Sequence, residues 1–333
     1  MTRSRSLRVL WAFAFALAPS IGATVAAQSS PGAAAGSSKA SPPPRPAKGP
    51  ALRTPDGRPD LQGTWDFAQL TPFERPGQYG EKSVLSDVEA EEFGQNRITQ
   101  DNKDRRDGTA DQDVARAYND FWWDFGTRVA KQASLVVDPP NGRLPALTAD
   151  GQKKAANQTP KYDNVEERPL AERCILGFNS GPPMMPSAYN NNMQLVQTPT
   201  QVLILNEMVH SARVIDLSGR PHRPASMRFL TGDSIGRWDG NTLVVDTTNF
   251  STEGNFRFST RDMHLVEHFS LEDAGTLRYE FTMDDPAVWT AKWTASIPMR
   301  RSDELIFEYA CHEANYGLEG VLKGARYAET VKR

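Results

Sequence analysis

The sequence is poor in cysteine, with only Cys174 and Cys311 among its 333 residues. In an oxidising compartment an isolated pair of cysteines most often forms a disulfide, so we expect Cys174 and Cys311 to be joined. Closing so long a loop stabilises a protein by about 4–5 kcal/mol when only chain entropy is counted. A reactive thiol and a metal thiolate are the alternatives to this bond.

Several catalytic signatures are missing as well. The chain has no G-x-S-x-G motif, no phosphate-binding P-loop, no dinucleotide-binding glycine fingerprint and no Ser/Lys pair with a familiar spacing. Nucleophilic serine or cysteine chemistry is therefore unsupported, and we expect no nicotinamide or nucleotide cofactor.

The compact motifs of zinc sites, H-E-x-x-H and C-x-x-C, are also absent. His264 and His268 lie on one face of an expected strand and Glu267 on the other, and successive same-face positions of a strand are about 7 Å apart. These two imidazoles are therefore too far apart to share a metal, and we expect none. A metal site assembled from several strands is the alternative, since the chain has five histidines: His210, His222, His264, His268 and His312.

Neither sign of charge dominates the chain. Its 38 basic and 41 acidic side chains leave a formal net charge of −3, and no stripe of Lys and Arg alternates with aromatic residues. A nucleic-acid partner is therefore not expected. The longest apolar run, Val9–Ala18, is shorter than the about 20 residues that span a bilayer, so no transmembrane segment is expected either.

The N-terminal region has the pattern of a secretory signal peptide. Three arginines precede the apolar run, and small residues at Val25 and Ala27 suit cleavage before Gln28. We therefore expect a signal peptide over 1–27, a disordered tether rich in Pro, Ala and Ser over 28–51, and a single β-rich domain over 52–333. The mature protein should be exported, to the periplasm or beyond the cell.

The first part of this domain mixes short strands with a helical elaboration at about 84–130. Strands are expected within 58–67 and 134–148. A capping box of Ser86 and Glu89 predicts a helix over 86–98, and a second helix is expected over 111–126, with Val114, Tyr118 and Phe121 or Trp122 on one face.

From about 193 to 316 the sequence pattern is that of a β meander. Nine short β-branched or aromatic segments follow one another, bounded by Gly, Pro, Asn or Asp. We expect strands at 193–198, 201–208, 212–217, 234–238, 242–247, 263–270, 276–283, 288–297 and 304–311. An antiparallel meander of this length protects its edges by closing into a barrel or folding into a sandwich, and we expect the barrel.

Two long motifs, GDSIGRWDGNTLVVDTTNF (232–250) and FEYACHEANY (307–316), resemble a set of secreted bacterial proteins of unknown function. The run VVDPPNGRLP (136–145) also looks like that set, and the likeness spans most of 55–328. Such a family implies no assigned reaction. The triplet Gly63-Thr64-Trp65 is similar to the G-x-W that begins the first strand of lipocalins, which implies a calycin-like barrel.

Within the first motif, two carboxylates fall inside strands. If Asp239-Gly240 forms a two-residue type I′ turn, Asp233 faces Asp246 across the hairpin. Two facing carboxylates repel unless they share a proton, a cation or an arginine, which suits acid–base chemistry. A bulge at Gly240 would instead place Asp246 opposite Gly232. The structural alternative is that both aspartates bond loop amides.

The second motif concentrates polar groups after a strand. Glu308 and His312 share one expected face, and a bond from Cys311 to Cys174 would hold His312 rigidly. A rigid imidazole beside a carboxylate is a candidate general base. A purely structural hydrogen-bonded knot is the alternative.

Other residues are candidates for contacting a ligand. Glu207 and Arg213 flank an expected hairpin, where they form either a salt bridge or part of a cavity wall. Trp289 and Trp293 share one face of an expected strand, as core or as a stacking floor for a ring. Arg237, from the first motif, completes the expected ligand-binding set.

These patterns together favour an exported barrel enzyme that acts on a small compound. The hypothesis assigns His312 as base, and Glu308, Asp246, Asp233 and Arg213 as acid, orienting or anion-stabilising groups. The reaction class is a lyase, isomerase or hydrolase step. The rival hypothesis is a non-catalytic carrier with the same barrel, in which these residues clamp a ligand or pair with one another.

Overall fold

The structure is a computed structural model that describes residues 53–105, 107–115, 120–157, 161–251, 256–313 and 315–331. All of these residues belong to one compact unit, Pro44–Arg333. The expected signal peptide and tether lie outside the described residues. No helix in the described part of the chain is both long and apolar enough to cross a membrane.

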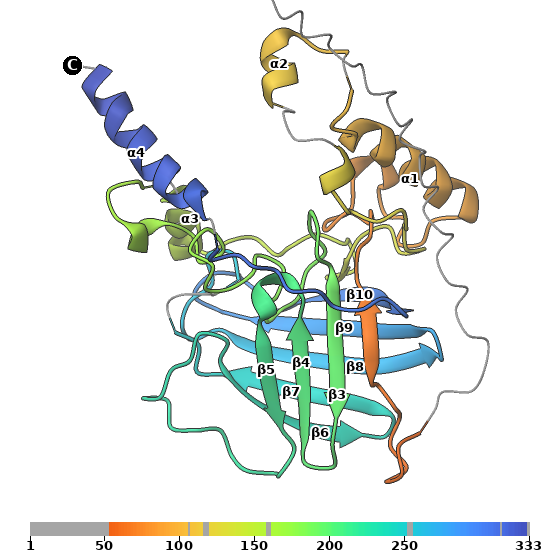
Figure 1. The fold of residues 1–333 in the computed structure, drawn as a ribbon. Coiled ribbons are helices and arrows are strands. Elements are labelled where there is room, and N and C mark those ends of the chain that lie inside the picture. The colour runs from red at the N-terminus through yellow and green to blue at the C-terminus, as the bar shows by residue number, and fades with distance from the viewer. Residues whose placement is uncertain are drawn as a thin grey trace, which may run out of the picture. The chain divides into compact units, whose positions relative to one another are not determined.

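Ten strands form one sheet, and nine of them close into a barrel (Figure 1). β1 closes the ring because it pairs with β3 on one side and with β10 on the other, while β2 adds to β10 outside the ring. The strands are β1 (Gly63–Asp66), β2 (Val136–Asp138), β3 (Asn192–Gln197), β4 (Gln201–Asn206), β5 (Ala212–Asp216), β6 (Asp233–Asp239), β7 (Thr242–Thr248), β8 (His264–Asp273), β9 (Thr276–Asp284) and β10 (Trp293–Ser302).

The expected fold class, a mainly β meander that closes into a calycin-like barrel, is confirmed. The meander is not antiparallel throughout. β5 and β6 run parallel and meet at one residue pair, Asp216 and Ile235, because the long connection 217–232 brings the chain back in the same direction. The other neighbouring strands of the barrel are antiparallel.

Large side chains fill the interior of the barrel. Alternate residues of each strand point inward, as the period-two pattern of β8 and β9 shows in their burial. The fully buried set includes several aromatic residues, and no ring of small residues leaves room for a wide lumen. These aromatic residues are Trp65, Phe269, Tyr279, Phe281 and Trp293.

The seam of the barrel is closed by an arginine that lies on a tryptophan. Trp65 of β1 and Arg301 of β10 are cross-strand partners, and the guanidinium lies 4.3 Å from the centre of the buried indole ring. Arg301 also donates to the backbone oxygens of Gln62 at 2.6 Å and Ala274 at 3.0 Å. This side chain of β10 therefore contacts the start of β1 and the turn between β8 and β9.

The helices are α1 (Asp87–Asp101), α2 (Ala110–Ala115), α3 (Ala149–Ala156) and α4 (Tyr316–Val331), with short 3₁₀ turns at Gly77–Tyr79, Asp120–Trp122, Val165–Glu167 and Met208–His210. The capping box of Ser86 and Glu89 is present at the start of α1, as expected. The helix expected over 111–126 is described only as α2 and the turn at 120–122. Helices α3 and α4 were not expected.

Two expected strands are corrected. The segment 304–311 is extended but pairs with no described strand, because β1 already occupies the free edge of β10. We call this segment the strap; it crosses the ends of β3, β4 and β5 in Figure 1. The strand expected over 288–297 begins only at Trp293, after a turn.

The expected register of the 232–250 hairpin is also wrong. Gly240 and Asn241 form the turn, with Gly240 at a φ of 57°, so that Asp239 pairs with Thr242 and Asp246 pairs with Ile235. Neither the expected type I′ register nor the bulged one is formed. The register differs by two residues from the type I′ expectation, which keeps Asp246 on the expected face of the sheet.

Replacing Arg301 should weaken the whole barrel. Arg301→Ala removes two charge-assisted hydrogen bonds and the contact with the Trp65 ring, so we expect the free energy of unfolding to fall by about 2–4 kcal/mol. Urea denaturation followed by tryptophan fluorescence measures this loss. Arg300→Ala is the matched control, and an equal loss in both variants would contradict the role of Arg301.

Candidate functional site

Two histidines join Asp233 and Asp246 on the outer face of the barrel. His222 reaches both carboxylates, with Nδ1 3.2 Å from Asp233 and Nε2 3.0 Å from Asp246. His264 Nε2 lies 2.9 Å from the same Asp246 oxygen. An imidazole between two carboxylates can exchange protons with both, so this imidazole–carboxylate network suits acid–base steps.

Asp233 is the most strongly held carboxylate of the network. Its side chain is buried, which by itself raises its pKa, but hydrogen bonds from Arg220, the Arg223 amide and His222 outweigh burial and lower the pKa to about 2. Arg220 also donates to Asp216 at the end of β5. The network thus fastens the connection 217–232 to the barrel wall.

Asp246 and His264 are coupled across β7 and β8. The hydrogen bond from His264 lowers the pKa of Asp246, and the same bond raises the pKa of His264 above its usual value. Both side chains remain more than a third exposed, so solvent screens this pair. The sequence predicted the two aspartates but not their link through His222, because that residue lies in an irregular connection.

A buried ion pair occupies the barrel interior. Arg213 of β5 makes two hydrogen bonds to Glu267 of β8, at 2.5 and 2.8 Å, and the Tyr279 hydroxyl donates to the same carboxylate at 2.8 Å. The Tyr279 oxygen in turn accepts the backbone N–H of Met184 at 3.2 Å. The carboxylate partner of Arg213 is therefore Glu267, and not Glu207 as the salt-bridge alternative expected.

Met184 belongs to a segment, 177–186, that enters the end of the barrel. The Met184 side chain is buried in the core. Gly181 has a φ of 66°, and an added Cβ there would collide with the backbone of Pro183, so this turn requires glycine. We call 177–186 the plug.

Glu207 holds the strap against the barrel. It accepts hydrogen bonds from Asn192 at 2.9 Å and from the Phe307 amide at 3.2 Å. The Tyr309 amide donates to His210 at 3.1 Å. Side chains of the β4–β5 connection thus replace the strand partner that the strap lacks.

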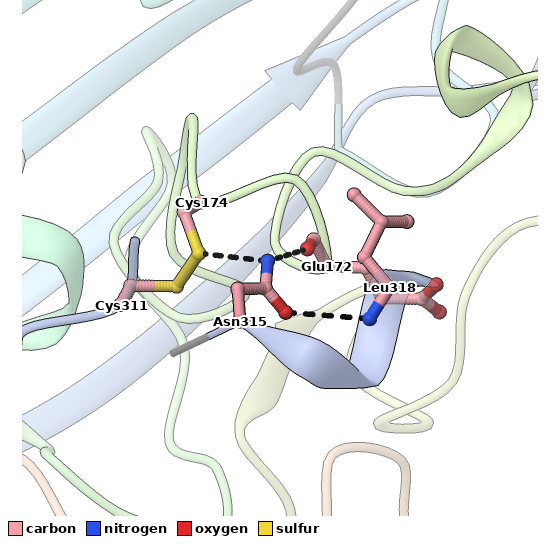
Figure 2. The surroundings of a disulfide bond; sticks show 5 residues. All are labelled: Glu172, Cys174, Cys311, Asn315 and Leu318. Carbon is pink, nitrogen blue, oxygen red and sulfur yellow. Dashed lines mark hydrogen bonds between the residues drawn. A yellow bond between two sulfur atoms is a disulfide. The ribbon is translucent and has the colours of Figure 1, made fainter. Parts of the chain in front are cut away.

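The disulfide between Cys174 and Cys311 is confirmed, and it anchors the end of the strap (Figure 2). Asn315 reinforces it, because its side-chain amide donates to the backbone oxygen of Glu172 at 2.8 Å and lies 3.3 Å from Cys174 Sγ. Its oxygen accepts the Leu318 amide at the start of α4, at 3.4 Å. The disulfide therefore joins the segment before the plug to the strap, and Asn315 links this junction to the start of α4.

The five residues expected to act in catalysis occupy three different places. Asp233 and Asp246 belong to the outer network, Arg213 lies inside the barrel, and Glu308 and His312 are exposed residues of the strap and the turn after it. In the described part of the chain, no hydrogen bond or ion pair joins one place to another. Their shared catalytic role stays a prediction.

The expected ligand-binding aromatic residues lie in the core. Trp289 and Trp293 are buried, with ring centres 5.6 Å apart at 73°. Phe258 packs against Trp289 at 5.8 Å and Phe256 against Trp293 at 6.0 Å. Arg237 is exposed on the outer face of β6.

These two phenylalanines line a cavity of about 810 Å³ that is built from loops. We call it the loop cavity. Its lining residues come from the end of α3, from 166–185 and from 256–259, and none belongs to a barrel strand. Its volume lies within the range of about 300–1,000 Å³ typical of small-molecule sites.

The loop cavity is lined by apolar and charged side chains in similar measure. The apolar part includes Leu176, Phe178, Met185, Phe256 and Phe258, and four basic side chains stand against two acidic ones: Lys154, Arg168, Arg173 and Arg257 against Glu166 and Glu167. Sequence patterns did not indicate this site, since loop residues have no periodicity.

No group of three His, Cys, Asp or Glu side chains among the described residues is arranged to hold a metal ion. In particular, the imidazole–carboxylate network is a set of hydrogen bonds centred on one Asp246 oxygen.

No protein-family model matches the chain, and no curated protein matches it either. Among solved structures, the chain is similar to the crystal structure of a single-residue mutant of the fluorescent protein UnaG. The sequences are 16% identical, the match covers 34% of this chain and 72% of that one, and the TM-score is 0.23.

Asp233→Asn should change how stability depends on pH. The folded pKa of Asp233, about 2, is below its unfolded value of about 4, so its stabilising contribution is present above about pH 4 and is lost as the pH falls towards 2. In urea denaturation from about pH 6 to 2, the difference between wild type and Asp233→Asn should shrink with falling pH. Asp239→Asn, at the exposed end of β6, is the control. A pH-independent difference would contradict the assignment.

Removing the disulfide should destabilise the protein. For Cys174→Ala combined with Cys311→Ala we expect a loss of about 2–5 kcal/mol in the free energy of unfolding, because the unfolded chain regains the freedom that the bond removed. Urea denaturation measures it, with the wild type under reducing conditions as a second comparison. A loss below about 1 kcal/mol would show that the hydrogen bonds of Asn315 suffice.

Proposed function

We propose that this protein is an exported binding protein for a small organic molecule, which it holds in the loop cavity. The observation that supports this most directly is the cavity itself, with its volume of about 810 Å³ and its mixed apolar and basic lining. A concave site with an apolar wall and a few convergent polar groups is the usual form of a ligand pocket.

The barrel interior is a poor alternative location for the ligand. Trp65, Phe281 and Trp293 fill it, and the plug inserts Met184 into one end. A ligand in the interior would have to displace this packing or the ion pair between Arg213 and Glu267, and both displacements are costly.

Three independent anchors support the walls of the loop cavity. The hydrogen bond from Met184 to Tyr279 holds the plug, which contributes Pro182, Pro183 and Met185. The disulfide fixes the wall around Cys174. The third anchor is the core pair of tryptophans, on which Phe256 and Phe258 rest. Preformed walls lower the entropic cost of binding.

Binding is favoured over acid–base catalysis because the expected catalytic residues are distributed over three places, whereas the cavity residues converge. Export is supported by the disulfide, since such bonds persist in oxidising compartments. The three arginines and the short apolar run within 1–27, which are typical of a signal peptide, support export independently.

The proposal is tested with N-phenylnaphthylamine, a neutral apolar dye that becomes fluorescent in apolar sites. We expect one saturable site per protein. Ala171→Trp should weaken binding by about tenfold or more, because Ala171 lines the cavity and an indole would occupy part of it. Ala212→Trp, on the exposed face of β5, should bind the dye like the wild type.

Absence of saturable binding would overturn the proposed function. Equal affinity in Ala171→Trp and the wild type would place the dye outside the loop cavity and would overturn the location. Circular dichroism and the thermal midpoint establish that both tryptophan variants are folded.

A further inference from the structure

We propose that the natural ligand of the loop cavity is an organic anion with an apolar body, whose carboxylate or sulfonate group binds between Arg173 and Arg257. This inference rests on the proposed function and specifies its ligand. Both arginines line the cavity and come from two different segments, one from the segment before the plug and the other from 256–259.

Two of the charged side chains that line the cavity, Arg168 and Glu167, already have partners within the loop. Arg168 donates to Glu172 at 2.8 and 2.9 Å, and its guanidinium lies 4.4 Å from the centre of the Tyr162 ring. Glu167 accepts the backbone amides of Asp163 and Asn164. These side chains brace the loop itself, so they are not available to a ligand.

Arg257 is held in place without an acidic partner. Its guanidinium lies 4.6 Å from the centre of the Phe73 ring and 5.5 Å from that of Phe256. No described residue forms a hydrogen bond or an ion pair with its side chain. Burial lowers the pKa of Arg257, and the more distant Glu74 offsets only part of that effect. An anion in the cavity would supply the missing counter-charge.

The backbone of Arg257 is also constrained. Its φ is 52°, in the left-handed region that is unfavourable for a residue with a Cβ. Arg257 lines the cavity, and Phe256 and Phe258, on either side of it in the chain, pack against the core tryptophans.

Arg173 faces the cavity from the disulfide wall. The next residue, Cys174, has a φ of 57° and is bonded to Cys311, so the chain is fixed beside Arg173. Within the described part of the chain, the Arg173 side chain has no hydrogen bond and no ion pair. Its fork of N–H donors matches a carboxylate or sulfonate.

The rest of the cavity fits an apolar body. Phe178, Phe256 and Phe258 present ring surface, and Met185 and Leu176 add flexible and branched apolar contacts. An aromatic or alicyclic acid would place its rings here and its charge between the two arginines. A small inorganic anion would leave these apolar surfaces uncovered.

The test compares two dyes with the same ring system, anilinonaphthalene sulfonate, which is anionic, and N-phenylnaphthylamine, which is neutral. Wild-type protein should bind the sulfonate about tenfold more tightly than the neutral dye. Arg173→Gln and Arg257→Gln should each weaken sulfonate binding by about tenfold and change neutral-dye binding by less than about twofold. Arg300→Gln, on β10 and outside the cavity lining, should change neither.

Two further measurements do not depend on the folding of the glutamine variants. In the wild type, raising the salt concentration from about 50 to 500 mM should weaken sulfonate binding but not neutral-dye binding. Arg257→Lys should recover part of the sulfonate affinity, since it keeps the charge but loses the fork of donors.

The outcomes separate the two proposals. If both dyes bind equally and salt affects neither, the anion inference is overturned and the proposed function stands. If neither dye binds, both are overturned. If Arg300→Gln weakens sulfonate binding as much as the cavity variants do, the effect is one of overall charge, and the assignment to Arg173 and Arg257 is wrong.

Discussion

The ion pair between Arg213 and Glu267 is the constraint on which the rest of the structure depends. Its two charges lie in the barrel interior, where they are tolerated only because each satisfies the other through two hydrogen bonds. Removing either partner would leave an unpaired buried charge, at a cost of about 3–5 kcal/mol. Burial and the nearby carboxylate raise the pKa of Tyr279 well above its usual value, so its hydroxyl stays protonated and can donate to Glu267 while accepting from Met184. A polar cluster in the barrel thus sets the position of the plug.

One wall of the loop cavity depends on this arrangement, and the other walls have different physical supports. The plug depends on hydrogen bonds to the buried cluster, whereas the wall around Arg173 depends on a covalent bond. The wall formed by Phe256 and Phe258 depends on ring packing against the core. Loops without such supports would sample many conformations, and a ligand would have to order them at an entropic cost. The distribution of supports explains how a site with no strand residue in its lining can still be preformed.

Most of the barrel could be predicted from the sequence, because alternation of apolar and polar residues reports directly on strands with one buried face. The 232–250 register was missed because a two-residue shift preserves that alternation, so only the turn geometry at Gly240 distinguishes the choices. The composition of the strap predicts a strand, but strand formation also requires a free sheet edge, and β1 occupies the edge of β10. Helix α4 was missed although Leu318, Leu322 and Ala325 recur at helical spacing. In the candidate site, the alternation of residues along β8 is enough to place Glu267 on the face opposite His264 and His268. Arg173 and Arg257 lie in loops, where no periodic pattern indicates which way a side chain points.

In a filled barrel with a site in its loops, the strands provide stability and the loops provide the ligand contacts. The barrel contributes stability through apolar packing that a ligand never contacts, so ligand contacts need not interrupt the core. The cavity residues lie in connections, where substitutions disturb fewer buried neighbours than they would in a strand. A cavity of this kind can change the chemistry that it recognises through a few loop side chains while Trp65, Arg301 and the Arg213–Glu267 pair remain. Under the proposed function, the unpaired arginines of the loops, and not the more numerous charged groups of the strands, would therefore determine ligand choice.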